Sequence, residues 1–167
     1  MAVLPSVDLG TGRTATAISA RSFHSCALLD NASVKCWGRN KYGQLGIGNT
    51  TTMGDNSSEM AVLPSVDLGT GRTATAIAAG YSHTCALLDN ASVKCWGYNE
   101  YGQLGIDNST TMGDGPGEMA VLPSIDLGTG RTATAIAAGL YHSCALLDNA
   151  SVKCWGRNNY GQLGIDN

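Results

Sequence analysis

Hydrophobic residues occur in short runs separated by polar turns, and no stretch sustains the 3.6-residue apolar spacing of an amphipathic helix. Residues 73–79 (TATAIAA) are small, whereas residues 83–89 (HTCALLD) and 93–97 (VKCWG) form two apolar runs. The letters DNAS at 89–92 separate these two runs as a hairpin turn would. The pattern predicts three short strands over these ranges and no helix.

A fourth apolar run covers residues 61–66 (AVLPSV). It contains Pro64, which has no backbone N–H to donate to a central ladder and therefore belongs on an edge strand. We expect each unit to be a sheet of four antiparallel strands, with this run on the outer edge.

The chain is a tandem repeat. The letters MAVLPSVDLG at residues 1–10 return unchanged at 60–69 and with one change at 119–128, so the period is 60 − 1 = 59 residues. The copies are 1–59, 60–118 and 119–167, the last one truncated by ten residues, within one domain. Four short strands at such a period are typical of a β-propeller blade, and small residues suit its crowded innermost strand. We therefore predict an all-β fold.

Composition narrows the possible functions. Glycine is abundant, with 22 residues against 4 prolines, which indicates many tight turns. Only 14% of the residues are charged, the net charge is −3, and Lys and Arg form no run, so nucleic-acid binding is disfavoured. No apolar run reaches 18 residues, so we expect no membrane span.

The segment AAGYSHTCALLDNASVKCWGYNEYGQLG at 78–105, matched at 19–46 and 137–164, resembles the repeat of the regulator of chromosome condensation (RCC1) family. The motifs that carry the resemblance are HTxAL at 83–87, WGxN at 96–99 and GQLG at 102–105. The resemblance implies a propeller, usually of seven four-stranded blades closed by a strand from one terminus.

Two positions depart from the family pattern. Asn-Ala stands at 31–32, 90–91 and 149–150, where the family usually has Asp-Gly or Asn-Gly. Alanine in a left-handed conformation costs on the order of 1 kcal/mol, so we expect slight strain in this turn. The first copy also has Arg21 where the others have Gly80 and Gly139.

Three blades are too few for a closed ring, because propellers need about four to eight. The chain begins with an outer-strand run at 2–7 and ends just after the GQLG turn at 161–164. The expected partial propeller is therefore completed either by missing chain or by oligomerisation, in which two chains exchange outer strands to form a six-bladed ring. We favour a slice of a longer array.

The six cysteines form three pairs with one spacing: Cys26 and Cys36, Cys85 and Cys95, Cys144 and Cys154. If the hairpin turn has three residues, Cys26 faces Cys36 with β-carbons about 4.5–5.5 Å apart, near the roughly 3.5–4.5 Å of a disulfide. A two-residue turn would place Trp37 opposite Cys26 instead. We expect disulfides, with reduced thiols or a metal site that includes His24 as alternatives.

A histidine precedes Ser or Thr in every copy, which raises the alternative of a Cys/His nucleophile pair. Because an active site is normally built once per propeller, we expect structural roles for these repeat markers, which are His24, His83, His142, Trp37, Trp96 and Trp155. We expect no enzyme activity, cofactor or metal. Disulfides would indicate an extracellular or secretory compartment, although residues 1–9 contain no secretory signal; a signal upstream of a slice would reconcile the two.

In a four-stranded antiparallel meander, the loops after the first and third strands lie on one face. The copies differ mainly in these loops, at 21–23, 80–82 and 139–141 and at 39–41, 98–100 and 157–159, and we call this face the variable face. The opposite loops, DNAS and DLGTGRT, do not change. The candidate partner-binding residues are Arg21, Phe23, Arg39, Lys41, Tyr81, Tyr98, Glu100, Tyr141 and Arg157.

Tyrosine and arginine are enriched at the hot spots of protein interfaces. We therefore expect a non-catalytic protein-interaction module that binds a macromolecular partner, a protein, through the variable face. Drift of exposed loop tips after duplication is the alternative explanation. The resemblance also implies guanine-nucleotide exchange on a small GTPase, or enzyme inhibition, as other functions.

Overall fold

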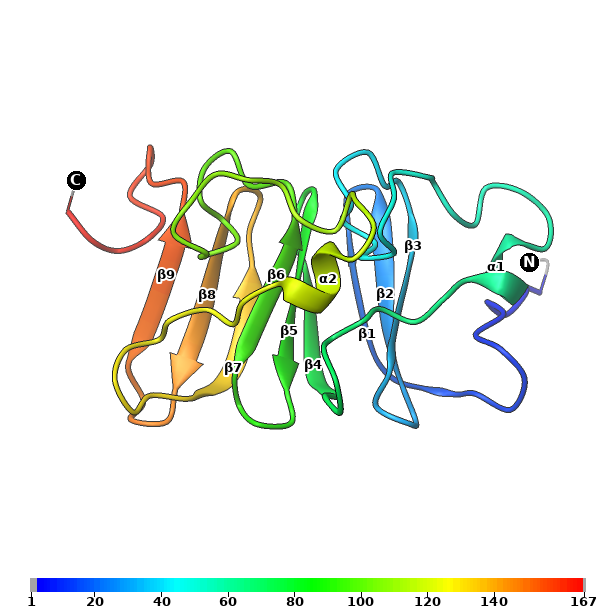
Figure 1. Ribbon diagram of the computed structural model, residues 1–167, viewed down its shortest axis with the longest axis horizontal. Coiled ribbons are helices and arrows are strands. Elements are labelled where there is room, and N and C mark those ends of the chain that lie inside the picture. The colour runs from blue at the N-terminus through cyan, green and yellow to red at the C-terminus, as the bar shows by residue number, and fades with distance from the viewer. Residues whose placement is uncertain (1–2, 167) are drawn as a thin grey trace.

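The computed structural model describes residues 3–166 and contains three antiparallel sheets that follow one another along the chain (Figure 1). Each sheet has its strands in sequence order. The first blade contains β1 (Ala15–Arg21), β2 (His24–Leu29) and β3 (Val34–Gly38); the second β4 (Ala74–Ala79), β5 (His83–Leu88) and β6 (Val93–Gly97); the third β7 (Ala133–Ala138), β8 (His142–Leu147) and β9 (Val152–Gly156). The three strands predicted for each unit are thus present.

The predicted fourth strand is wrong, as is the prediction that the chain has no helix. Short helices occupy α1 (Glu59–Val62) and α2 (Glu118–Val121) instead. Before α1, the Glu59 carboxylate accepts backbone hydrogen bonds from Gly54, Asp55 and Asn56, which turn the chain into the helix. Hydrogen bonds from Asn56 and its neighbours lower the pKa of Glu59 to about 2. A single helical turn is too short to show a periodic apolar pattern.

The residues after each helix lie along the third strand of the preceding sheet without forming a ladder. Leu63 precedes Pro64 and has ψ 118°, the extended conformation that a following proline favours. The Val66 N–H then donates to the Val34 carbonyl at 2.8 Å, and the Ile125 N–H donates to the Val93 carbonyl at the same distance. Each described sheet therefore has three strands rather than four, and an outer segment lies beside the third strand of the first two sheets.

The hairpin between the second and third strands has the three-residue turn. The Leu29 N–H donates to the Ser33 carbonyl, and Ala32 has φ 61°, in the left-handed region. Cys26 therefore faces Cys36, and the two form a disulfide, as do the other two pairs. Their Cα atoms are 4.1 Å apart, close to the roughly 4.5 Å of a non-hydrogen-bonded pair, where facing side chains approach most closely.

Apolar side chains pack between successive blades. Between the first two, Leu28 and Val34 of the first blade meet Leu88 and Trp96 of the second. Val66 and Leu68 of the outer segment cover this contact. The first strands β1, β4 and β7 contact one another in succession, as expected for innermost strands. Within residues 3–166, no helix is long and apolar enough to cross a membrane.

Hydrogen bonds link the same blades beside this core. The Gln44 carbonyl accepts from Thr84 Oγ1 at 2.8 Å and from Trp96 Nε1 at 3.1 Å. Because the Thr84 hydroxyl proton goes to Gln44, the 2.9 Å contact between Thr84 Oγ1 and His24 Nε2 requires the histidine to donate. The second and third blades repeat the arrangement with Gln103, Ser143, Trp155 and His83.

Candidate functional site

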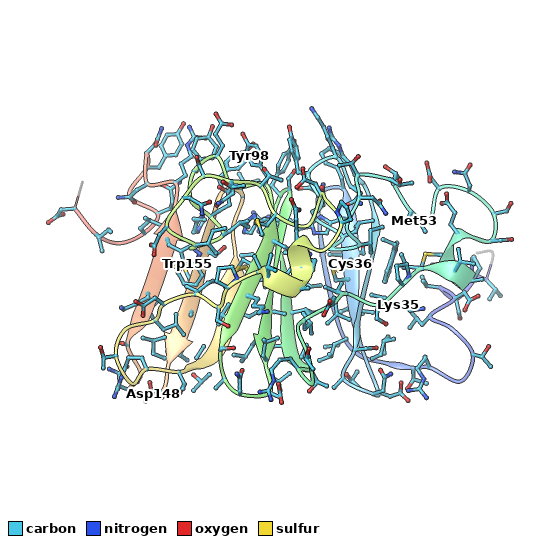
Figure 2. The ribbon with its side chains drawn as sticks, viewed as in Figure 1. Lys35, Cys36, Met53, Tyr98, Asp148 and Trp155 are labelled. Atoms are coloured by element: carbon cyan, nitrogen blue, oxygen red, sulfur yellow. A yellow bond between two sulfur atoms is a disulfide. The ribbon has the colours of Figure 1, made fainter. Side chains whose placement is uncertain are left out.

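The variable face is the edge of the molecule opposite the hairpin turns. In Figure 2, Tyr98 is labelled on the variable face, and Asp148, which lies in a hairpin turn, is labelled on the opposite edge. Phe23, Tyr81 and Tyr141 lie in the tight turns that precede β2, β5 and β8. The glycine that ends the third strand of each sheet has a positive φ, which is 107° at Gly97. It redirects the chain into the loop that follows this strand. A side chain there would collide with the backbone of Ser82 and His83, so the turn requires glycine.

Aromatic side chains from all three blades form a connected row on this face. The ring centroids of Phe23 and Tyr81 are 5.8 Å apart, and those of Tyr81 and Tyr141 are 5.5 Å apart, both with edge-to-face geometry. Tyr141 lies 6.3 Å from Tyr98, which lies 4.6 Å from Tyr42. Such spacings lie within the range of favourable aromatic pairs. The rings therefore form one continuous surface across the blades, which we call the aromatic row.

Three cations lie over rings of this row. Arg39 lies 5.4 Å from the Phe23 centroid, and Lys41 lies 5.0 Å from the Tyr42 centroid. Arg157 lies 5.1 Å from the Tyr101 centroid and also contacts the rings of Tyr141 and Tyr160. These distances are within the roughly 6 Å of a cation–π contact. The Tyr98 hydroxyl donates a hydrogen bond to Glu100, the one carboxylate among the candidate residues.

The structure brings together eight of the nine candidate residues and separates one. Arg21 does not join the aromatic row, because its Nη1 reaches the Ala138 carbonyl of the third blade at 3.4 Å. Three further tyrosines lie in or beside the aromatic row and were not predicted from the sequence: Tyr42, Tyr101 and Tyr160. They are identical in all copies, so a search for differences among the copies passes over them; the repeated Tyr-Gly-Gln-Leu motif is the signal that marks them.

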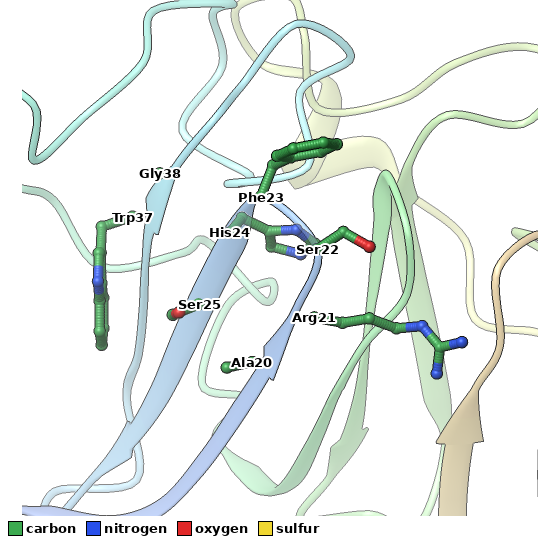
Figure 3. A pocket seen from close by; sticks show the side chains of 8 residues that line it. All are labelled: Ala20, Arg21, Ser22, Phe23, His24, Ser25, Trp37 and Gly38. Carbon is green, nitrogen blue, oxygen red and sulfur yellow. The ribbon is translucent and has the colours of Figure 1, made fainter.

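A hollow of about 320 Å³ opens beside the first turn of this face (Figure 3). In Figure 3, the Arg21 side chain points away from Trp37 and toward the later blades. Its lining residues are Ala20, Arg21, Ser22, Phe23, His24, Ser25, Trp37 and Gly38.

His24 and His83 lie inside the blade contacts and not on the aromatic row. Burial lowers the pKa of His24 to about 4. Burial, and then the positive charge of the two neighbouring histidines and of Arg21, lowers the pKa of His83 to about 3. Both imidazoles are therefore neutral at pH 7 and act as hydrogen-bond donors between blades. Among residues 3–166, no cluster of three or more His, Cys, Asp or Glu side chains could hold a metal.

Antiparallel sheets that pack face to face, with their first strands innermost, are the blades of a β-propeller, of which this chain forms part. The model of the regulator of chromosome condensation (RCC1) repeat matches residues 15–44, 74–103 and 133–162, and a second model of the same repeat matches 33–87 and 92–146. The chain belongs to this family.

Relatives in sequence and structure agree with this assignment. The chain is 31% identical over 142 residues to the human probable E3 ubiquitin-protein ligase HERC4, a match that covers 85% of this chain and 12% of the ligase. Yeast RCC1 (Prp20) has the same fold, with a TM-score of 0.69 and 20% identity over 93% of this chain and 32% of the other. Human WBSCR16 gives a TM-score of 0.70 and 21% identity over 93% and 37%.

The chain spans between 12% and 37% of the length of each of these proteins. The match to HERC4 covers only a repeat-bearing portion of that protein, so the ligase activity in its name is not assigned to this chain. What the comparisons show is the RCC1-type propeller fold and the family.

Proposed function

We propose that this chain is a non-catalytic interaction module that binds a protein partner through the aromatic row and the cations over it. The observation that carries the proposal is the linkage of aromatic rings from all three blades into one surface on the face where the copies differ. Tyrosine and arginine are common at hot spots because they combine a large apolar area with hydrogen-bonding groups.

The exposure of this surface supports binding. Phe23, Tyr101 and Tyr160 are exposed, although their side chains are large and apolar over most of their area. Ring contacts with Tyr81 and Tyr141 hold Phe23 and Tyr101 in place, so a partner would meet rings that are already ordered, and less side-chain entropy would be lost on binding. A rigid, exposed aromatic surface is suited to a folded partner.

The charge of the surface indicates the chemistry of that partner. Arg39, Lys41 and Arg157 outnumber Glu100 here, whereas the whole chain has a net charge of −3. A partner surface with apolar residues bordered by carboxylates would complement the row. Protein binding also occurs in the family, since the yeast RCC1 structure was solved with Kap60 bound.

A capture experiment tests the proposal. We would immobilise the 167-residue chain and compare the proteins that it retains with those retained by the double variant Tyr98→Ala, Arg157→Ala. Arg131→Ala is the matched control, because Arg131 lies by the opposite turns in an exposed ion pair with Asp148. The double variant should lose at least one partner that both the parent chain and the control retain, with similar melting temperatures. Identical retention by all three proteins would refute the proposal.

A further inference from the structure

Six asparagines of the chain stand in the pattern Asn-X-Ser/Thr, which N-glycosylation requires. Three of them lie in the hairpin turn between the second and third strands of each blade, and we call them the hairpin asparagines: Asn31, Asn90 and Asn149. The other three lie in the loops after the third strands, and we call them the loop asparagines: Asn49, Asn56 and Asn108. The sequence pattern does not separate the two groups, whereas their side-chain contacts do.

The hairpin asparagines share one exposed side-chain arrangement. In the second blade, Oδ1 of Asn90 accepts the backbone N–H of Ser92 at 3.2 Å and the Ser92 hydroxyl at 2.7 Å. The same two bonds recur in the first and third blades. Within residues 3–166, the amide nitrogen Nδ2 of these three side chains donates no hydrogen bond. The atom that would carry a glycan is therefore uncommitted, on a residue that is exposed in every blade.

The loop asparagines use the same nitrogen to hold their loops together. Nδ2 of Asn108 donates to the Ile106 carbonyl at 3.2 Å, and Asn49 makes the equivalent bond at 3.4 Å. The backbone carbonyl of Asn108 also accepts from the buried Asn99 at 2.9 Å, which fixes this loop on its blade. Nδ2 of Asn56 donates to two neighbouring carboxylates at 3.2 and 3.1 Å. A glycan replaces one hydrogen of Nδ2, so at Asn56 one of these two bonds would have to break.

The hairpin asparagines also lie where a bulky group has room. Figure 1 shows the hairpins β2–β3, β5–β6 and β8–β9 turning at one edge of the molecule. Figure 2 labels Asp148, the residue before Asn149, on this edge and Tyr98 on the other. Asn90 remains exposed although its blade has a neighbour on either side. Glycans on this edge would leave the aromatic row uncovered.

The disulfides are a second, independent observation that points to the same chemistry. Each blade contains one disulfide, and it joins the two strands of the hairpin that carries the asparagine. Disulfides form and persist in oxidising compartments such as the lumen of the endoplasmic reticulum. N-glycosylated asparagines occur on surface loops of proteins that pass through the secretory pathway. The hairpins therefore combine the acceptor pattern with a cross-link that belongs to the same compartment.

We propose that Asn31, Asn90 and Asn149 are acceptor sites for N-linked glycans and that the loop asparagines are not. In the transfer step, Nδ2 bonds to the anomeric carbon of an oligosaccharide. The bond between that carbon and a lipid diphosphate breaks, the lipid diphosphate leaves with the bonding electrons, and Nδ2 gives up one proton. The donor is thus a lipid-linked oligosaccharide diphosphate, and a transferase of the secretory compartment catalyses the step. This inference is independent of the partner proposed for the aromatic row.

Site mapping tests the proposal. We would direct the 167-residue chain into the secretory pathway of cultured eukaryotic cells with a cleavable leader, and collect it from cells and medium. Peptide N-glycosidase in heavy-oxygen water converts each glycosylated asparagine into a labelled aspartate, which mass spectrometry of peptides locates. Labelling of each hairpin asparagine should exceed that of any loop asparagine about fivefold or more, the factor that corresponds to one hydrogen bond of about 1 kcal/mol. A chain without glycans, or equal labelling of the two groups, would overturn the proposal.

Two triple variants provide matched controls. The hairpin variant combines Asn31→Gln, Asn90→Gln and Asn149→Gln, and the loop variant combines Asn49→Gln, Asn56→Gln and Asn108→Gln. The hairpin variant should lose the change in gel mobility that the glycosidase causes in the parent chain, whereas the loop variant should keep it. The opposite pattern would contradict the assignment.

A second hairpin variant covers the case in which the longer glutamine side chain disturbs the turn. It combines Ser33→Ala, Ser92→Ala and Ser151→Ala, which keep the asparagines and remove the hydroxyl that the acceptor pattern requires. This variant should also lose the change in mobility, while near-ultraviolet circular dichroism shows it folded. If it keeps the full change, the glycans lie elsewhere and the proposal is wrong.

Discussion

Lowering the pH from 7.5 to 5 should destabilise the blade contacts through His24 and His83. Their pKa values in the folded chain are about 4 and about 3, below the value of about 6.5 in an unfolded chain. The unfolded state therefore binds more protons in this interval, so the free energy of unfolding falls as the pH falls. The stabilisation is complete above about pH 6.5 and is lost progressively toward pH 4 and then pH 3.

The size of the effect follows from these pKa values. At pH 5 an unfolded histidine is almost fully protonated, whereas both folded histidines remain almost fully neutral. Each therefore lowers the free energy of unfolding by about 2 kcal/mol relative to pH 7.5, or about 4 kcal/mol together. Most carboxylates titrate below pH 5, so this interval reports mainly on the histidines.

Urea unfolding followed by tryptophan fluorescence, at a fixed protein concentration and at several pH values from 7.5 to 5, measures this loss. His83→Gln keeps an N–H donor for Ser143 but cannot be protonated, so the loss should fall to about 2 kcal/mol. His142→Gln is the control, because His142 is only partly buried and should contribute less. Equal stability at both pH values, or a wild-type loss in His83→Gln, would refute the reasoning.

Three further changes test the scaffold by urea unfolding. Replacing Cys85 and Cys95 with alanine should cost about 3 kcal/mol, because the unfolded chain loses a cross-link; an unchanged midpoint would contradict this. Ala91→Gly should stabilise the chain by about 0.5–1 kcal/mol by relieving a left-handed alanine, and a loss would be the contrary result. Trp96→Phe should cost about 1–3 kcal/mol through its lost interblade hydrogen bond, and Trp37→Phe, in the first blade, much less.

The strands that the local sequence determines were predicted. The single-turn helices and the outer segments that follow them were not. The apolar run at 83–89 predicted the strand that the structure has at His83–Leu88, and the expectation that Cys26 faces Cys36 if the turn has three residues is confirmed. The outer segment was misjudged because its conformation depends on the carboxylate of Glu59 and on the neighbouring blade, neither of which appears in an apolar pattern.

The candidate surface was predicted only in part, because contacts between its rings depend on how the blades pack and not on local sequence. The copies differ at Tyr98 and Tyr141, and strand direction alone places both loops on one face. The copies do not differ at Tyr42 or Tyr101, so only the structure shows that these rings lie within contact distance of the variable ones. Arg21 illustrates the opposite error, because it belongs to a variable loop but reaches across to the third blade.

By itself, the amino-acid sequence determined the repeat and three of the four strands predicted in each copy, because these depend on residues close together in the chain. It left the pairing of the cysteines dependent on the length of one turn. The tertiary structure alone decided how His24 meets Thr84 and which rings join the aromatic row. Such contacts join residues about one repeat apart. They follow from the way in which whole blades stack, and a local apolar pattern does not predict that stacking.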